Sequence, residues 1–588
     1  MTLLSNHLPK TMLLAATIGL ATSLPPWICT ADSADLSQLS PVRASKHSKP
    51  GEPLADMTLE NFVGSAKCSF CHSNLTDKSG EDMSITNHWR STMMANAAKD
   101  PLWLAKVKSE VARNPHLAQV IEEKCVSCHM PMAYRQMTAL PGSYPLAAGV
   151  SILDHFTSPE SALHMAAMDG VSCSLCHQIQ DQGLGSKESF SGKFIIDTET
   201  PAPERKIFGP YKETDARAMQ TSIGFDPVYG PQMNDAALCA TCHTLYTPYV
   251  DAKGNVVGEF PEQTVYLEWL NSIYGEPAGT RHEIGETKGS IRTCQECHMP
   301  HSASGGVLIA SPATKKTEPQ DHFSQHHFVG GNAFMLNILM DNPTVTKVSA
   351  PTSKFEDTRN RTLSQLREKT AALSIAKLRH RGDTIEAVVK VENFVGHKFP
   401  TGIPTRRTWL HFTVADASGT IIFDSGKPLA DGGIMGNDAD QDLSCYEPHY
   451  DKITTANQVQ IYEAVMKNTD NEVTYTLLRG AGYLKDNRLL PKGFNQQNVN
   501  PDIAVYGKAL EDKNFTAGSD TVTYAIPLNS AVGPFTVSAE LLYSAVSLAF
   551  MNDLKRDNSI KEVKMFSKQY DRADKMPVVV AAVQEKIR

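Results

Sequence analysis

The chain has 588 residues and a mass of 64.3 kDa, which is too large for one compact core, so several folded units are expected. Hydrophobic residues make up 41% of the chain and charged residues 20%, a composition typical of a globular rather than a disordered protein. The net charge of −8 argues against nucleic-acid binding, which requires a basic surface.

The first 31 residues have the pattern of a secretory signal. Lys10 supplies the positive start, an apolar run extends from Thr11 to Leu24, and Cys29-Thr-Ala31 provides a small-residue cleavage site. The run is shorter than the about 20 apolar residues of a membrane span. We therefore expect a cleaved signal in residues 1–31 rather than an anchor or a lipidated Cys29. The mature protein is then periplasmic or extracellular and has no transmembrane segment.

Residues 32–56 are rich in Ser, Pro and Lys and have no apolar period, so a flexible leader is expected there. Residues 57–345 follow as the first predicted domain. Helical character is expected in Asn96–Arg113, and Pro115–Lys124 is expected to lead as a helix into a cysteine motif. Residues 177–235, rich in Gly and Pro, are expected to form long loops.

Five copies of the motif Cys-x-x-Cys-His occupy this first domain. They are Cys68, Cys71 and His72; Cys125, Cys128 and His129; Cys173, Cys176 and His177; Cys239, Cys242 and His243; and Cys294, Cys297 and His298. Two thiols at this spacing lie on one helical turn and reach both vinyl groups of one haem, while the next residue lies beneath the iron. Zinc sites also use Cys-x-x-Cys, but they do not need His after every second Cys. Thioredoxin-like chemistry would need one motif, not five.

The motifs therefore predict five covalently bound haem c groups, with the five motif histidines as proximal iron ligands. Little room is left for an ordinary apolar core, so the haems themselves are expected to form the core of residues 57–345, packed by short helices.

The composition changes near residue 345. Residues 346–372 are expected to be a linker and a bridging helix, with an irregular stretch from Asp341 to Phe355 and a helix from Asp357 to Leu373. Residues 373–588 are expected to form an antiparallel β-sandwich-like domain. The expected strands are Thr384–Glu392, Trp409–Ala415, Thr420–Asp424, Gln458–Val465, Glu472–Leu478, Asp520–Pro527 and Phe535–Tyr543. The predicted fold class is thus α+β in two lobes.

Several strings beyond the motifs point to a known group of proteins. They are Trp89-Arg-Ser-Thr-Met-Met-Ala95, Asp169-Gly-Val-Ser-Cys-Ser-Leu-Cys-His-Gln-Ile179, Phe260-Pro-Glu-Gln263, Gly396-His-Lys-Phe-Pro-Thr-Gly402, Gln458-Val-Gln-Ile-Tyr-Glu463 and Lys485-Asp-Asn-Arg-Leu-Leu-Pro491. With them, the chain resembles secreted pentahaem c-type cytochromes that carry a C-terminal β-domain. These belong to the superfamily of pentahaem nitrite reductase, hydroxylamine oxidoreductase and the tetrahaem cytochromes of nitrifiers.

The distal ligand of each iron has to come from outside the motifs. The first domain offers a surplus of nine further histidines, at positions 88, 116, 155, 164, 282, 301, 322, 326 and 327. His326 is the first choice because the glycines that follow it permit close backbone approach to a porphyrin. His116 and His164 each lie nine residues before a motif cysteine. His397 could bring a ligand from the β-domain, unless it is a structural turn histidine.

Met94 is a fifth candidate, and it rests on the resemblance. Related cytochromes place a ligand histidine in a string like Trp-x-x-Ser-x-His-Ala, and Met94 stands at that histidine place. A thioether ligand would raise the reduction potential of its haem. The alternative is a pair of core methionines, Met93 and Met94.

Electron transfer is the predicted function, with other redox proteins as donor and acceptor and no catalytic residue. One alternative is a reductase of nitrite, hydroxylamine or a sulfur oxyanion with one open haem. Pentahaem nitrite reductase replaces the motif His by Lys at its active haem, whereas all five motifs here end in His. Another alternative is a homo-oligomer, a subunit of an extracellular cytochrome filament or a surface complex.

One cysteine of the mature chain, Cys445, lies outside the motifs, and a structural thiol is expected there. His449 follows it, close in sequence to Asp438, Asp440 and Asp442. Acidic loops of this kind are usually solvated, so no metal site is predicted there.

Overall fold

The fold was analysed in a computed structural model, which describes residues 50–147, 149–213, 215–276, 289–312 and 317–588. The expected signal peptide (1–31) and residues 32–49 of the expected leader (32–56) lie outside the described residues, as does His282. Both helices and sheets are present, so the predicted α+β class is confirmed.

Helices dominate the part of the chain that carries the motifs. They are α1 (Ser65–His72), α2 (Ile85–Trp89), α3 (Pro101–Arg113), α4 (Ala118–His129), α5 (Pro131–Ala139), α6 (Ile152–Thr157), α7 (His164–Met168), α8 (Cys173–Cys176), α9 (Ala216–Ile223), α10 (Ala236–His243), α11 (Val265–Leu270), α12 (Cys294–His298), α13 (Ala333–Asp341) and α14 (Pro343–Thr346). The helix α15 (Thr352–Lys369) follows, and α16 (Leu548–Lys555) and α17 (Lys561–Arg572) lie within the strand-rich C-terminal part. The predicted helix over residues 96–113 divides into a 3₁₀ turn (η2, Ala97–Lys99) and α3. Asp100 causes the division, because its carboxylate caps α3 by accepting from the amides of Leu102 and Trp103.

Strands dominate the C-terminal part. They are β5 (Ala371–Arg381), β6 (Thr384–Asn393), β7 (Arg407–Ala415), β8 (Ile421–Ser425), β9 (Lys452–Ile453), β10 (Ile461–Lys467), β11 (Gly482–Asp486), β12 (Ser519–Pro527), β13 (Phe535–Ser544) and β14 (Val578–Ile587). The motif part adds two small pairs, β1 (Lys206–Gly209) with β2 (Asp226–Tyr229) and β3 (Thr244–Val250) with β4 (Val256–Thr264).

The C-terminal strands form two sheets. One has the order β11-β10-β7-β13-β14, with β8 also paired to β7, and the other has the order β5-β6-β12-β9. All these pairs are antiparallel except β12 with β9. Burial alternates along β6, as expected of a strand with one face on a core. The two inner faces meet where Phe412 of β7 stacks on Tyr524 of β12, with ring centroids 3.8 Å apart.

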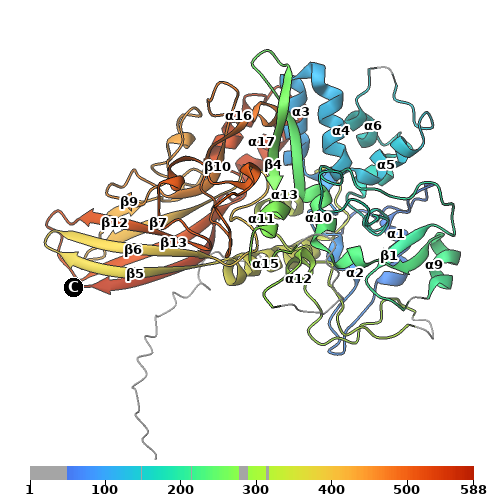
Figure 1. Cartoon of the computed structure of the whole chain (residues 1–588), viewed down its shortest axis with the longest axis horizontal. Coiled ribbons are helices and arrows are strands. Elements are labelled where there is room, and N and C mark those ends of the chain that lie inside the picture. The colour runs from blue at the N-terminus through green and yellow to red at the C-terminus, as the bar shows by residue number, and fades with distance from the viewer. Residues whose placement is uncertain (1–49, 148, 214, 277–288, 313–316) are drawn as a thin grey trace, which may run out of the picture.

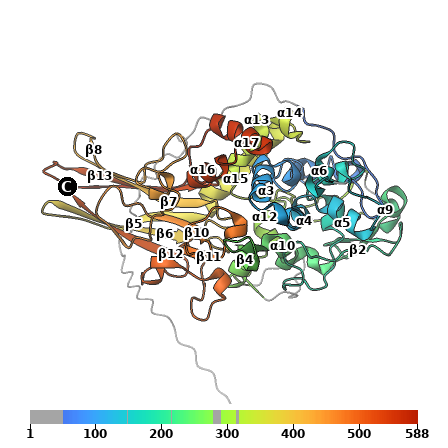
Figure 2. The same cartoon turned by 90° about the horizontal axis from the view of Figure 1, so that it is seen from above.

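The sheets and the motif helices lie toward opposite ends of the molecule, with α3, α11, α15, α16 and α17 between them (Figures 1 and 2). Polar contacts join the two regions. The Arg113 guanidinium of α3 binds the carboxylates of Asp553 and Asp557, each at 2.7 Å. Lys106 of α3 donates to the Tyr475 carbonyl oxygen at 2.8 Å. The two regions are therefore joined by side-chain contacts as well as by the chain that connects them.

Two expectations about local structure were wrong. The stretch from Asp341 to Phe355, expected to be an irregular linker, contains α14 and the start of α15, and Phe355 is buried against α13. The expected strand Glu472–Leu478 does not form. The buried Glu110 carboxylate accepts from the amides of Leu477 and Leu478 instead, at 2.7 and 3.4 Å, so those amides are not available for a sheet.

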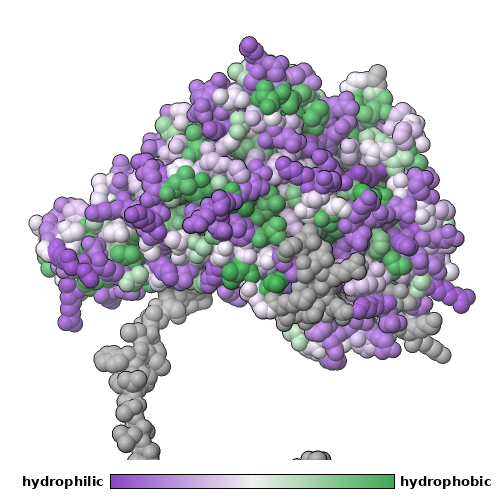
Figure 3. Space-filling view, in the orientation of Figure 1, coloured by the Kyte–Doolittle hydropathy of each residue, from purple (hydrophilic) through white to green (hydrophobic). Residues whose placement is uncertain are grey.

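In the described part of the chain, none of the helices has both the length and the apolar composition of a membrane span. On the face drawn in Figure 3, hydrophilic residues predominate and hydrophobic residues form separate small patches.

Candidate haem-binding site

Each of the five motifs lies at the end of a short helix. The motifs occupy α1, the last turn of α4, α8 with its C-cap His177, α10 and α12. Residues three apart lie on one face of a helix, so both cysteines of each motif point the same way and the histidine follows directly. None of the ten motif cysteines is paired in a disulfide. This geometry fits the attachment of one porphyrin edge to each pair.

Four of the five motif histidines are held by the same hydrogen bond. Nδ1 donates to a backbone carbonyl oxygen: His72 to Ile309 at 2.6 Å, His129 to Ala97 at 3.1 Å, His177 to Phe208 at 2.6 Å, and His298 to Val329. A carbonyl only accepts, so the proton lies on Nδ1 and the Nε2 lone pair is free for a metal. His243 makes no side-chain hydrogen bond within the described residues.

Burial keeps the motif histidines neutral. Desolvation lowers the pKa of His72, His177 and His298, and it lowers the pKa of His129 and His243 to about 4. A neutral imidazole is the form that binds iron. At neutral pH these imidazoles are therefore uncharged, and no proton has to be released from them before iron binds.

The thiols show which motifs are neighbours. A hydrogen bond to the Cys173 thiol, followed by burial, raises the pKa of Cys68 well above its usual value, and Cys239 acts on Cys294 in the same way. The pKa of Cys242 is raised first by its hydrogen bond to Cys128. Burial raises the pKa of Cys176 to about 12, and the nearby Cys173 and Cys239 thiols add to that rise. The first motif is thus beside the third, the third beside the fourth, and the fourth beside the second and fifth.

Two predicted distal histidines lie opposite motif histidines. The ring centroids of His177 and His326 are 6.4 Å apart with planes 20° apart, and those of His298 and His397 are 6.4 Å apart with planes 14° apart. Two imidazoles that share a metal at the usual metal–nitrogen distance of about 2 Å have their centroids roughly 6 Å apart. The space between each pair of rings therefore suits one iron, and the residues present fit a haem with two imidazole ligands.

The same two histidines have the hydrogen bond of a metal ligand. Nδ1 of His326 donates to the Ser324 carbonyl oxygen at 3.2 Å, and Nδ1 of His397 donates to the Lys398 carbonyl oxygen at 2.8 Å. Burial lowers the pKa of His326 to about 3 and that of His397 to about 4. His164 shares this arrangement in part, because its Nδ1 donates to the Phe156 carbonyl oxygen at 3.1 Å.

Met94 lies between two motifs. Its carbonyl oxygen accepts from the amides of Val171, two residues before Cys173, and of Ala97, whose own carbonyl holds His129. Met93 packs into two hydrophobic clusters, whereas Met94 belongs to none of the clusters formed by the described residues. The packing of Met93 fits the alternative of a core methionine, whereas the role of Met94 stays a prediction.

His116 does not have the geometry of a distal ligand. It is exposed at the surface, and its Nε2 donates to the Gly254 carbonyl oxygen at the tip of the β3–β4 hairpin, at 2.8 Å. Its nine-residue spacing from Cys125 was the reason for choosing it. The turn that begins at Pro115 places the side chain outside the motif helix, so the spacing has no structural consequence.

Two further histidines near the site were not singled out from the sequence. His88 and His327 are buried with ring centroids 4.4 Å apart, and Nδ1 of His88 and Nε2 of His327 have no hydrogen-bond partner in the described structure. Desolvation lowers the pKa of His88 to about 4. Buried orphan nitrogens of this kind call for a missing partner. The sequence signal was weak: His327 is only the second of a histidine pair, and His88 only precedes Trp89.

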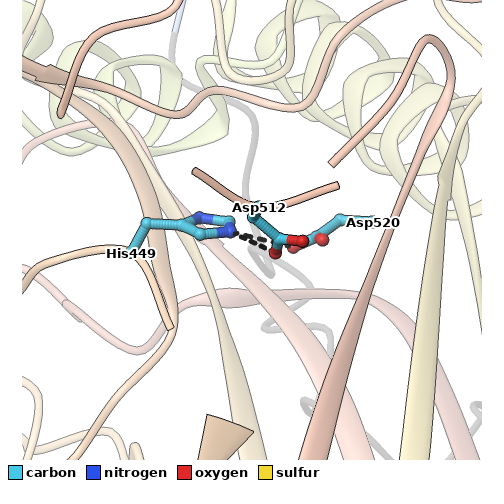
Figure 4. A group of neighbouring side chains, drawn as sticks. All are labelled: His449, Asp512 and Asp520. Carbon is cyan, nitrogen blue, oxygen red and sulfur yellow. Dashed lines mark hydrogen bonds and ion pairs between the residues drawn. The ribbon is translucent and has the colours of Figure 1, made fainter. Parts of the chain in front are cut away.

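A separate cluster in the β-sheet region brings His449, Asp512 and Asp520 together (Figure 4). Nε2 of His449 lies 3.0 Å from Asp512 Oδ2 and 3.9 Å from Asp520 Oδ2, and all three side chains are buried. Asp440, which lies close to His449 in sequence, pairs with Arg407 instead. The chain thus supplies three possible ligand residues, one imidazole and two carboxylates, at one point.

The side-chain amides around His449 hold the imidazole in a tautomer that does not suit metal binding through Nε2. Gln460 and Asn487 donate to Nδ1 at 2.8 and 3.0 Å, and their oxygens are held by the amides of Tyr450 and Glu463. Nδ1 is therefore unprotonated, and the proton lies on Nε2, which donates to Asp512. A neutral histidine that binds a metal through Nε2 carries its proton on Nδ1. We interpret this cluster as a buried hydrogen-bond network rather than a metal site.

Comparisons with known proteins give one distant likeness. No protein-family profile matches the chain, and no curated protein matches its sequence. Among solved structures, the chain is similar to a penta-heme cytochrome c552 from Thermochromatium tepidum. The identity is 14% and the TM-score 0.44, over 89% of this chain and 98% of that one. At this similarity, the function has to be inferred from the residues of the chain itself.

Proposed function

We propose that this chain is an extracytoplasmic pentahaem c-type cytochrome that transfers electrons between other redox proteins. The observation that carries the proposal is the placement of His326 and His397 opposite His177 and His298, at the spacing of two imidazoles on one metal. Five Cys-x-x-Cys-His motifs supply the attachment points. When bound, haem supplies reversible one-electron chemistry at its iron.

The chain's own residues then have defined roles. The ten motif cysteines form the thioether bonds, the five motif histidines are the proximal ligands, and His326 and His397 are distal ligands of the third and fifth sites. Two saturating ligands exclude water and small molecules from an iron, which suits electron transfer rather than substrate binding. Met94 and His164 remain candidate distal ligands of the other sites.

The contiguity of the motifs supports transfer rather than storage at isolated centres. The first, third and fourth motifs form a row through contacting or neighbouring cysteines, and the second and fifth both adjoin the fourth. The fourth motif is thus a branch point with three neighbours. A branched arrangement gives the protein more than one entry or exit route for a partner.

The test combines haem counting with ligand variants. Mass spectrometry of the denatured holoprotein should show five covalent haems. In the oxidised protein, His326→Ala and His397→Ala should each convert one haem from low-spin to high-spin, and after reduction that haem should bind carbon monoxide. His116→Ala is the matched control and should change neither property. Four or fewer haems, or two ligand variants with unchanged spectra, would overturn the proposal.

A second candidate function, reduction of a small oxyanion, is favoured by the surroundings of His243. Among the described residues, no imidazole lies opposite His243 as His326 does for His177. Burial lowers the pKa of His243, and the nearby Arg406 guanidinium lowers it further. A cation such as Arg406 next to an open site would attract an anion. A high-spin haem in the unmodified protein, with turnover of nitrite, hydroxylamine or a sulfur oxyanion, would establish this alternative.

A further inference from the structure

Glu268 is a fully buried carboxylate on α11, at the boundary between the motif region and the sheets. Its Oε2 accepts from the Lys398 amide at 3.1 Å and from the Thr401 hydroxyl at 2.6 Å. Its Oε1 accepts from the Thr264 hydroxyl at 3.1 Å and pairs with the Arg488 guanidinium at 2.9 Å. A carboxylate this well satisfied holds its partners in one geometry.

The carboxylate belongs to a balanced buried cluster of charges. The Lys398 ammonium pairs with Asp486 at 2.7 Å, and Arg488 binds both oxygens of Asp486 at 2.9 and 2.8 Å. Lys398 and Asp486 are nearly inaccessible to solvent. Two anions and two cations thus neutralise one another, and removal of one charge would leave the others uncompensated in a dry environment.

This charge cluster holds in place the chain segment that contains His397. Glu268 holds Lys398, the residue directly after His397, through its backbone amide. On the other side of His397, a Cβ added to Gly396 would lie 3.1 Å from Cδ1 of Trp269, so this backbone already packs against the indole. Both sequence neighbours of His397 are therefore held by consecutive residues of α11.

The same helix also holds the opposite side of the site. The Trp269 indole nitrogen donates to the Arg292 carbonyl oxygen at 2.8 Å, two residues before Cys294 and the motif that contains His298. The short helix α11 therefore contacts both chain segments whose histidines face each other at 6.4 Å. This one element therefore links the two segments that carry the facing rings.

We propose that Glu268 is the positioning residue that holds His397 opposite His298, and so couples the sheet region to the coordination of the fifth haem site. This inference rests on the proposed ligation by His397. Glu268 touches neither imidazole and acts through the Lys398 amide. The Glu268 carboxylate and its partners Arg488, Lys398 and Thr401 form a clamp that keeps the distal imidazole in place.

The variant Glu268→Gln tests the clamp with little change in size. We expect five haems, and one haem that is low-spin in the unmodified protein should become partly high-spin when oxidised and bind carbon monoxide when reduced. Added free imidazole should return that haem to the low-spin state, because the lost ligand is the only defect. Asp440→Asn is the matched control: it breaks the buried pair with Arg407 and should give no high-spin signal beyond that of the unmodified protein.

The outcomes separate the clamp from the ligation itself. If His397→Ala leaves the spectrum unchanged, the ligation proposal fails. If His397→Ala opens one iron while a folded Glu268→Gln protein gains no high-spin signal over the unmodified protein, the clamp is wrong and the ligation stands. If Glu268→Gln does not fold, Thr401→Val decides, because it removes one hydrogen bond and keeps the charge. When the Thr401→Val protein is heated, the additional high-spin signal should appear at a lower temperature than in the unmodified protein. An unchanged temperature would refute the clamp.

Discussion

The indole of Trp103 on α3 lies parallel to the imidazole of His129, with ring centroids 4.4 Å apart and planes 3° apart. Together with the hydrogen bond from Nδ1 to the Ala97 carbonyl oxygen, this contact leaves the ring of His129 one orientation. The ring plane of this motif histidine is thus set by a residue 26 positions earlier in the chain.

We expect Trp103→Leu to loosen that orientation. One low-spin signal in the electron paramagnetic resonance spectrum should broaden or shift, and the free energy of unfolding should fall by about 1–3 kcal/mol from the lost ring contact and packing. Trp103→Phe keeps a flat ring and should preserve the signal. Identical spectra for the leucine variant and the unmodified protein would show that the hydrogen bond alone orients His129.

Replacement by alanine should change the free energy of unfolding little at the exposed His116 and more at the buried His326. His116→Ala removes one surface hydrogen bond and should change the free energy of unfolding by no more than about 0.5 kcal/mol. His326→Ala should lower the free energy of unfolding by more than His116→Ala does, because it removes a buried ring that faces His177. Chemical denaturation followed by the haem absorbance measures both. A large loss for His116→Ala would contradict its placement at the hairpin tip.

Met94 can be tested by two substitutions with different signatures. If Met94 supplies a thioether, Met94→Ala opens one iron to carbon monoxide, and Met94→His lowers one reduction potential while leaving the other four in place. Redox titration followed by absorbance separates these results. Unchanged potentials and spectra in both variants would identify Met94 as a packing residue.

The pKa of Asp520 is raised to about 7, chiefly by burial, and its proton couples to folding. In the unfolded chain the group titrates near its ordinary value of about 4. Between about pH 4 and pH 7 the folded protein therefore holds a proton that the unfolded chain has lost. In this window Asp520 makes the protein less stable as the pH rises, and the full penalty is present above pH 7.

Asp520→Asn should remove that penalty. The variant should gain roughly 2–4 kcal/mol in free energy of unfolding above pH 7, and the gain should vanish near pH 4. Asp512→Ala is the control. It leaves the Nε2 proton of His449 unpaired and should cost about 1–3 kcal/mol. Denaturation at a series of pH values measures both, and a gain for Asp520→Asn that is equal at pH 4 and pH 8 would contradict the raised pKa.

The attachment motifs could be predicted from sequence because their chemistry is local. Two cysteines and a histidine within five residues share one helical turn wherever the chain runs. His326 could be proposed from the glycines that follow it, since close approach of the backbone needs a missing Cβ, and His397 from its place in the Gly396-His-Lys-Phe-Pro string. Which motif each one faces depends on contacts between distant segments, and no local spacing contains that information. The nine-residue spacing of His116 misled for the same reason.

The strands show the same division. β6, β7, β12 and β13 carry the β-branched and aromatic alternation that predicts them, and their observed bounds lie close to the expected ones. β5 was missed because its alanines and basic residues give little alternation, and it forms through pairing with β6. Glu472–Leu478 has strand-like composition, yet the distant Glu110 takes two of its amides.

The distance along the chain between His298 and His397 has a consequence for the order of assembly. His298 leaves the ribosome 99 residues before its facing imidazole, and the charges that grip His397 come later still, at Asp486 and Arg488. If His397 binds the fifth haem as proposed, the coordination of that haem can be completed only when most of the sheet region has folded. A chain truncated before residue 397 would then leave that haem with a single imidazole, and so with one open position on its iron.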